Sequence, residues 1–308
     1  MFVMEKFEVN ILGCGSALPT TRHLPSSQIV NFRENLFMID CGEGVQQQLR
    51  RTKQKFSRLA HIFLSHMHGD HVFGLPGLIS TLGLLGRTGD LFVYAHADAE
   101  KVFRPILDYF CKDLPFEVKF ISIDPAKHEV IYEDRSLRVW SLPLKHRVPT
   151  CGFLFEEKPR LRHLKPDMIE FWQIPIRDLH SIKEGEDWIA PDGTVVKNNM
   201  LTRTPVAPRR YAYCSDTAYT EKILPWVDGV DVLFHEATFT DEARQRAKQT
   251  FHSTAAQAAM IASKAKVKKL VIGHFSARYE DDTVLLKEAK QGFDNVILAK
   301  EGLKIELK

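Results

Sequence analysis

Four side chains able to bind a metal stand directly after a short apolar stretch near the start of the chain. The nonapeptide FLSHMHGDH contains them within six residues: His66, His68, Asp70 and His71. Burying such polar groups is costly unless they have partners, so their position after Ile62–Leu64 indicates a function. Imidazole and carboxylate ligands without a thiolate suit Zn²⁺ in a hydrolytic site, with Mn²⁺ or Fe as alternatives. The spacing predicts one short loop that serves two adjacent metals.

Three further candidate ligands each follow a predicted strand. They are His146 in PLKHRVP, Asp216 in YAYCSDT and His274 in VIGHFSARY. Each one alone is equally well explained as a solvated loop residue. Strand ends in packed sheets can bring such loops together, however, and the set then includes a carboxylate able to bridge two metals.

The elements that must position these residues are short. Apolar, β-branched or aromatic runs bounded by turn residues predict strands at Phe7–Leu12, Ser27–Phe32, Leu36–Asp40, His61–Ser65, Leu91–Ala95, Glu117–Ile121, Leu137–Leu142, Gly152–Glu156, Tyr211–Ser215, Val232–His235, Leu270–Gly273, Val296–Ala299 and Leu303–Leu307. Periodic patterns predict helices at Gly44–Arg51, Leu75–Gly86, Ala97–Phe110, Thr240–Lys248, Thr254–Lys264 and Thr283–Gly292. This order suits an α/β protein with two sheets packed face to face and helices outside.

One segment, Glu157–Thr204, lacks clear periodicity and is rich in Pro, Trp and charge. A long, weakly patterned insertion in a compact domain is usually functional or disordered, and the alternative is a tolerated surface excursion. We expect a single domain over residues 1–308 that carries this insertion at about 157–204.

The composition is that of a soluble globular protein, with 308 residues, 44% hydrophobic and 26% charged. A net charge of +3 does not by itself imply nucleic acid. Five scattered cysteines without a CxxC pair argue against a disulfide framework and a thiolate zinc site. The start, MFVMEKFE, has no unbroken apolar stretch, and Phe73–Gly86 is too short to span a bilayer. We therefore expect a cytoplasmic protein with no signal peptide and no membrane partner.

The motif HMHGDH with the three downstream ligands resembles the metallo-β-lactamase superfamily. Within it, the segments GCGSALPTTRHLPSS, DCGEG, SHMHGDHVFGLPGL, SDT, HEATF, FHST and GHFSARY resemble the ribonuclease Z family, the transfer-RNA 3′-processing endonucleases, over nearly the whole chain. The superfamily motif alone is compatible with many hydrolases, whereas HEAT followed by HST is more particular. The resemblance implies an αββα sandwich, two Zn²⁺ per chain, precursor transfer RNA as substrate and, for this short form, a homodimer.

The resemblance also implies a role for each site residue. One metal would be held by His66, His68 and His146, the other by Asp70, His71 and His274, with Asp216 as the bridge. Asp70 would accept a proton from the attacking water, and His252, oriented by Glu236, would protonate the leaving ribose oxygen. The alternative for FHST is that it only caps the helix that begins near Thr254.

Basic residues and the insertion are candidate RNA contacts. The basic runs RRTKQKFSR and KPRLRHLK are either solvated faces or phosphate-binding surfaces. The candidates are Arg50, Arg51, Lys158, Arg160, Arg162, Lys165 and, in GHFSARY, Arg278. The insertion occupies the interval in which ribonuclease Z relatives carry an arm that clamps the elbow of transfer RNA. The chain departs from the family at Tyr94–Ala97, where a Tyr-Gly-Pro loop is common.

Two other functions are compatible with parts of the pattern. One is a small-molecule hydrolase of the same superfamily, acting on a cyclic phosphodiester, sulfate ester, thioester or lactam. The insertion and the HEAT and HST motifs argue against it. The other is a noncatalytic RNA-binding relative, which the complete ligand set argues against.

Overall fold

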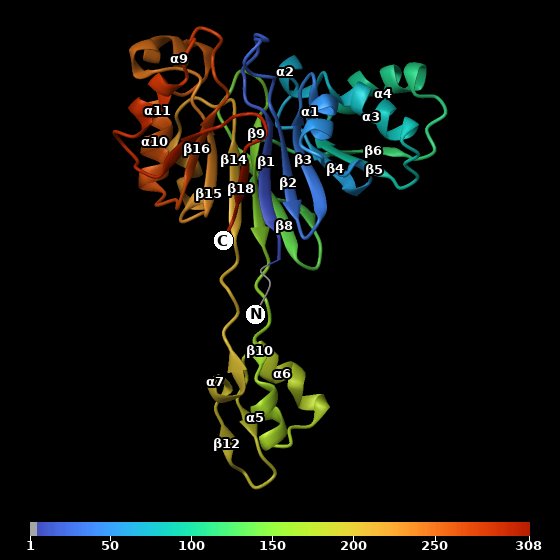
Figure 1. The fold of residues 1–308 in the computed structure, drawn as a ribbon, viewed down its shortest axis with the longest axis vertical. Helices are drawn as coiled ribbons and strands as arrows, with labels where there is room; N and C mark the ends of the chain where they lie inside the picture. Colours follow the sequence, from blue (N-terminus) through green and yellow to red (C-terminus); the bar gives the residue numbers. More distant parts are fainter. Residues whose placement is uncertain (1–4) are drawn as a thin grey trace. The chain divides into compact units, whose positions relative to one another are not determined.

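The computed structural model describes residues 5–308, so the first four residues of the amino-terminal segment, where we expect no signal peptide, lie outside the described residues. The described residues form two seven-stranded sheets with helices on the outer sides (Figure 1). One sheet has the order β18-β1-β2-β3-β4-β5-β6 and the other β17-β16-β15-β14-β9-β8-β7. The predicted αββα fold class is confirmed.

The strands of the two sheets have three to seven residues, and the two shortest, β17 and β18, lie at sheet edges. The first sheet contains β1 (Phe7–Gly13), β2 (Ser27–Phe32), β3 (Asn35–Cys41), β4 (Leu59–Phe63), β5 (Leu91–Ala95), β6 (Val118–Ser122) and β18 (Lys304–Glu306). The second contains β7 (Val130–Glu133), β8 (Leu137–Pro143), β9 (Cys151–Glu157), β14 (Arg210–Cys214), β15 (Val232–Glu236), β16 (Leu270–Gly273) and β17 (Val296–Leu298). The α-helices outside the insertion are α1 (Val45–Arg51), α2 (Gly69–Val72), α3 (Leu75–Leu84), α4 (Asp98–Phe110), α8 (Leu224–Val227), α9 (Arg244–Thr250), α10 (Ala255–Lys264) and α11 (Thr283–Ala289). Three 3₁₀ turns accompany them in the described residues: η1 (Phe56–Arg58), η3 (Glu221–Ile223) and η4 (Asp241–Ala243).

The central strands are buried on both faces. Met38 and Ile62 pack in the apolar cluster shared with α1, α3 and α4. Phe63 points to the other side, where its ring lies 5.6 Å from that of Phe155 in the second sheet. Apolar side chains on both faces explain why these strands are nearly continuous apolar runs rather than alternating ones.

The predicted bounds are right for β2, β5 and β16, but two local predictions beside the metal motif are wrong. Strand β4 ends at Phe63 rather than Ser65. The chain leaves the sheet because the Ser65 amide donates to the Asp40 carboxylate at 2.8 Å. Asp70 and His71 lie on the one-turn helix α2 rather than in a loop. The helix expected at Thr240–Lys248 begins as the 3₁₀ turn η4 and continues as α9.

The insertion is folded. Residues Glu157–Pro208, with Asp134–Leu137, form a second compact unit. It contains β10 (His163–Leu164), α5 (Pro166–Phe171), η2 (Ile176–Asp178), α6 (Leu179–Glu184), β11 (Trp188–Ile189), β12 (Val195–Val196), α7 (Asn198–Leu201) and β13 (Thr202–Arg203). Ile182, Trp188 and Leu201 are buried at its centre, and Trp172 packs against them. These elements escaped prediction because none exceeds six residues, too few to show a period.

Across residues 5–308, no helix has both the length and the apolar character needed to cross a bilayer.

Candidate metal centre and active site

The predicted ligands lie at strand ends from both sheets. Strands β14, β15 and β16 are parallel, so their carboxyl ends meet at one edge. Asp216 and His274 follow β14 and β16 at that edge, and His146 arrives after β8. The loop after β4 adds His66 and His68 from the other sheet.

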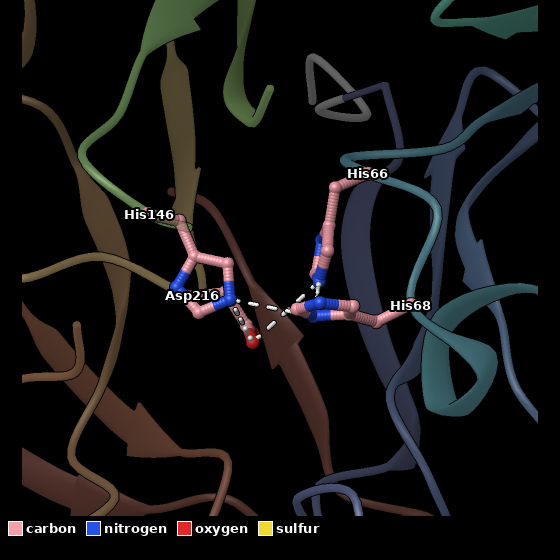
Figure 2. A group of neighbouring side chains, drawn as sticks. All are labelled: His66, His68, His146 and Asp216. Carbon is pink, nitrogen blue, oxygen red and sulfur yellow. Dashed lines mark hydrogen bonds and ion pairs between the residues drawn. The ribbon is translucent and has the colours of Figure 1, made fainter. Parts of the chain in front are cut away.

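One group of ligand atoms converges from both sheets. It consists of His66, His68, His146 and Asp216 (Figure 2), whose ligand atoms lie within 4.8 Å of one another. The Nε2 atoms of His66 and His146 lie 3.6 and 3.7 Å from Oδ2 of Asp216. Nδ1 of His68 lies 2.9 Å from His66 Nε2 and 3.3 Å from His146 Nε2.

A second group adjoins the first through the same carboxylate. Asp70, His71 and His274 also place their ligand atoms within 4.8 Å of one another. The Nε2 atoms of His71 and His274 lie 3.2 and 3.1 Å from Oδ1 of Asp216. Asp216 therefore presents one oxygen to each group, which is the arrangement that a bridging ligand requires.

The two groups fit a pair of metal ions. The Nε2 atoms of His71 and His274 are buried, and in the described residues neither forms a hydrogen bond, although both lie close to the Asp216 carboxylate. A buried polar atom without a hydrogen bond is costly, and a cation between these nitrogens and the carboxylates would satisfy both of them. The donors are imidazoles and carboxylates, a set that suits zinc.

Electrostatics prepare most of the histidines for metal binding. Burial, with repulsion from His71, holds the pKa of His66 well below its usual value, and burial also lowers the pKa of His68 and His146. These imidazoles are neutral at pH 7 and offer a lone pair to a metal.

The carboxylates and His71 behave in the opposite way. Burial acts to raise the pKa of Asp216, but the nearby histidines, above all His274 and His71, outweigh it and hold that pKa well below its usual value. Asp70 has a lowered pKa for the same reason. Burial acts to lower the pKa of His71, yet Asp216 and Asp70 raise it well above its usual value. His71 must therefore release a proton when a metal binds.

Asp40 supports the site from behind and was missed by the sequence analysis. Nδ1 of His71 donates to Oδ2 of Asp40 at 2.8 Å, and the Tyr213 hydroxyl donates to the same oxygen at 2.6 Å. Such partners fix the ring orientation of a metal-binding histidine. Asp40 adopts φ 56°, a left-handed conformation uncommon outside glycine. The one available signal was a carboxylate at the end of a buried strand, in DCGEG.

Glu236 is completely buried and gathers several donors beside the metal ligands. Nδ1 of His252 donates to its Oε1 at 2.8 Å, and the Thr217 amide donates to the same oxygen at 2.7 Å. Burial acts to lower the pKa of His252, but the charge of Glu236 raises it to about 9. Thr254 is the N-cap of α10, in a capping box with Gln257, so the cap does not involve His252.

Members of both ligand groups line a pocket of about 560 Å³ together with His252: His68, Asp70, His146, Asp216 and His274. Arg278, one of the predicted RNA contacts, lines it as well, together with Arg147 and Arg246, which the sequence analysis did not single out. Arg147 directly follows the ligand His146, and Arg246 shortly precedes His252. These positions could have indicated them, but neither lies in one of the two basic runs of the sequence.

The other predicted RNA contacts lie elsewhere. Arg50 and Arg51 occupy the end of α1. In the insertion, Lys158 and Arg160 lie near its start, where Arg160 pairs with Glu157. Arg162 donates to the Thr202 hydroxyl at 2.8 Å, and Lys165 donates to the Asn199 carbonyl at 2.9 Å.

A separate polar cluster holds the loop that contains His23. His23 lies 2.7 Å from Asp282 and 3.2 Å from Glu301, and hydrogen bonding to Asp282 above all raises its pKa to about 12. Burial raises the pKa of the neighbouring Cys14 thiol to about 12. A charged His23 between two carboxylates thus ties this loop to the carboxyl-terminal part of the chain.

The two-sheet sandwich and the histidine–aspartate groups at its strand ends define a metal-dependent hydrolase of the metallo-β-lactamase fold. Two family models match: "Beta-lactamase superfamily domain" over residues 203–275 and "Anti-Pycsar protein Apyc1" over residues 7–103. Ribonuclease Z of Phocaeicola vulgatus is 60% identical over 304 residues, covering 99% of this chain and 98% of that one. Ribonuclease Z of Parabacteroides distasonis is 58% identical and covers 99% and 100%. The chain belongs to the ribonuclease Z family.

A solved structure shares the fold. The crystal structure of the short form of human tRNase Z aligns with a TM-score of 0.70 at 24% identity, covering 98% of this chain and 99% of that one.

Proposed function

We propose that this chain removes the 3′ trailer of precursor transfer RNA, using two Zn²⁺ ions held by His66, His68, Asp70, His71, His146, Asp216 and His274. The observation that carries the proposal is the carboxylate of Asp216, which offers one oxygen to each histidine group. Cleavage leaves a 3′-hydroxyl on the transfer RNA and a 5′-phosphate on the trailer. Mn²⁺ or Fe would suit the same donor set.

The residues divide the chemistry between them. A pair of bound metals supplies positive charge that activates water and polarises the phosphate. Asp70, with its lowered pKa, is ionised at neutral pH and accepts the proton of the attacking water. His252, protonated at neutral pH, donates a proton to the leaving 3′-oxygen. Glu236 binds Nδ1 of His252 and so leaves Nε2 to face the pocket.

We assign the folded insertion to contact with the body of transfer RNA, and call residues 157–208 the arm. Phe171, Ile176 and Ile189 are large apolar residues exposed on it, at 74%, 87% and 66%. Phe171 makes an edge contact with Trp172 but is largely exposed, so it can stack on a base. Trp188 lies in the core of the arm, and Trp172 packs against that core. The basic residues near its start supply charge for the RNA backbone.

We also propose a homodimer that uses the ends of α3 and α4. Leu84, Tyr109 and Phe110 are exposed at 86%, 72% and 73%, and all three line one surface hollow. Apolar patches of this kind on a soluble protein mark interaction sites, and a symmetric dimer would bury the same patch on both copies. Light scattering should give the dimer mass, and Leu84→Glu with Tyr109→Glu should give the monomer. A wild-type monomer at micromolar concentration would contradict this part.

We place the enzyme in the cytoplasm, where precursor transfer RNA is made. The five cysteines are all free, as a reducing compartment requires.

The decisive experiment is to incubate the purified protein with a defined precursor transfer RNA and to sequence the new 3′ ends. We expect one cut at the 3′ side of the transfer RNA, lost in Asp216→Ala. Hydrolysis of bis(p-nitrophenyl) phosphate without RNA cleavage would indicate the small-molecule phosphodiesterase instead. RNA binding with neither activity would indicate a noncatalytic relative.

A further inference from the structure

Two arginines on the rim of the active-site pocket have no partner. Arg147 and Arg246 are exposed and line the pocket. In the part of the chain that the structure describes, neither guanidinium forms a hydrogen bond or an ion pair. Other exposed arginines do: Arg104 pairs with Glu100 at 2.8 Å, and Arg244 pairs with Asp241 at 3.1 Å. In the described residues, the pocket rim therefore carries two guanidinium groups that no ion pair neutralises.

These two arginines lie on the same side of the pocket. Nδ1 of His146 donates to the Phe251 carbonyl at 3.0 Å, which joins the loop after β8 to the end of α9. Arg147 directly follows His146, and Arg246 lies on α9 shortly before Phe251. The ring of His252 is 5.1 Å from that of His146. Both arginines thus stand on the side of the pocket that His252 occupies.

The chemistry of this pair points to a phosphate. A guanidinium presents a rigid fork of donors that matches phosphate oxygens and stays charged at any working pH. A single exposed arginine is usually only a solvated side chain. Two arginines without an ion-pair partner beside a phosphodiesterase site attract a substrate that carries several phosphates. They therefore indicate a contact with a phosphate other than the reacting one.

We propose that Arg147 and Arg246 together bind the backbone phosphate one nucleotide upstream of the cut, which is the last internucleotide phosphate of the transfer RNA product. The assignment rests on the proposed function, in which His252 protonates the leaving 3′-oxygen. That oxygen belongs to the last transfer-RNA nucleotide, so groups on the His252 side meet the transfer RNA rather than the trailer. The pair are positioning residues, and they make the enzyme prefer a polynucleotide to a small phosphodiester.

The first test compares Arg147→Ala and Arg246→Ala with Arg244→Ala. Arg244 is the matched control because it lies on the same helix but pairs with Asp241. Each rim variant should raise KM for precursor transfer RNA by roughly ten- to a hundredfold, the usual cost of a lost hydrogen bond to a charged group. The loss for bis(p-nitrophenyl) phosphate should be much smaller, and Arg244→Ala should match the wild type. Each rim variant should also reduce the number of ions released on RNA binding, given by the slope of log K against log salt, by about one.

The second test identifies the phosphate. A neutral methylphosphonate replaces one linkage at a time: the one upstream of the cut, the next one upstream, or the first one downstream. The methylphosphonate directly upstream of the cut should weaken cleavage by the wild type. It should not weaken cleavage by Arg246→Ala any further, because that variant already lacks the contact. Equal losses in the wild type and the variant, or coupling to the downstream linkage instead, would overturn the assignment. A wild type that leaves precursor transfer RNA uncut would refute the proposed function, whereas normal cleavage with unchanged KM in both variants would refute only this inference.

Discussion

Nδ1 of His252 donates to Oε1 of Glu236 across 2.8 Å, and Glu236 is completely buried. The Ser253 amide donates to the other carboxylate oxygen at 3.0 Å. The carboxylate is thereby immobilised, and its charge has little solvent to screen it. This one contact sets both the direction of the imidazole ring and its protonation state.

The alkaline limit of activity should depend on that contact. Because Glu236 raises the pKa of His252 to about 9, His252 stays protonated through neutral pH and loses its proton as the pH rises through that value. As a general acid it is then inactive, so kcat should fall. Glu236→Gln removes the charge and should move the falling limb to lower pH. Bound metal cations lower the pKa of His252 in the wild type and in Glu236→Gln alike. The measurement is therefore the difference between the two pH profiles of kcat. Coinciding limbs would contradict the assignment.

Removing the imidazole should separate proton donation from metal binding. His252→Ala should keep both metals and lose turnover of precursor transfer RNA by a factor of about 10²–10⁴, typical of a general acid. Bis(p-nitrophenyl) phosphate has a leaving group that needs no proton, so its hydrolysis should suffer far less. Equal losses for both substrates would remove His252 from the acid role.

Asp216 should control the metal content. Asp216→Asn keeps the shape of the side chain, and asparagine tolerates the φ of 57° found there. Without the negative charge between the histidine groups, the protein should lose metal and activity together while its circular dichroism persists. Elemental analysis after purification without chelators should find about two zinc ions per wild-type chain, as a two-metal site requires, and fewer in the variant. Full activity in a wild-type protein without any transition metal would disprove the metal centre.

Asp40 should tune metal affinity without touching the metal. Asp40→Asn tolerates the left-handed backbone but removes the charge behind His71. The loss of such a partner typically weakens metal binding about 10- to 100-fold. Competition with a chelator measures this, and added zinc should restore activity. An unchanged affinity would show that the contact serves only the fold.

The arm should affect transfer RNA and spare the chemistry. Replacing residues 157–204, which are most of the arm, with a short Gly-Ser linker removes none of the seven ligands, which all lie in the other compact unit. Metal content and hydrolysis of bis(p-nitrophenyl) phosphate should be nearly intact, while KM for precursor transfer RNA rises greatly. If the arm of one copy serves the site of its partner, mixing this deletion with Asp216→Asn should restore some activity. Unchanged transfer RNA cleavage would reduce the insertion to a surface excursion.

The sequence alone was sufficient for what depends on near neighbours in the chain. Strands such as β2, β5 and β16 are apolar runs with clear ends, so their bounds could be predicted. Each candidate ligand follows a strand, and this repeated local pattern selected His146, Asp216 and His274. The family could be recognised for the same reason, because its motifs are short segments of neighbouring residues.

Only the tertiary structure decided what depends on residues that are distant in the chain. The contact of Asp40 with His71 and Tyr213 joins the ends of β3 and β14 to helix α2, and no local pattern encodes it. The two-sided position of Asp216 likewise follows from the packing of two sheets. Arg147 and Arg246 become a pair because the hydrogen bond from His146 to Phe251 closes a loop of about a hundred residues, which charge along the sequence cannot reveal. The position of the arm could be predicted, but its helices and strands could not. They are too short to be stable alone, so they gain order from a shared core rather than from their own periodicity.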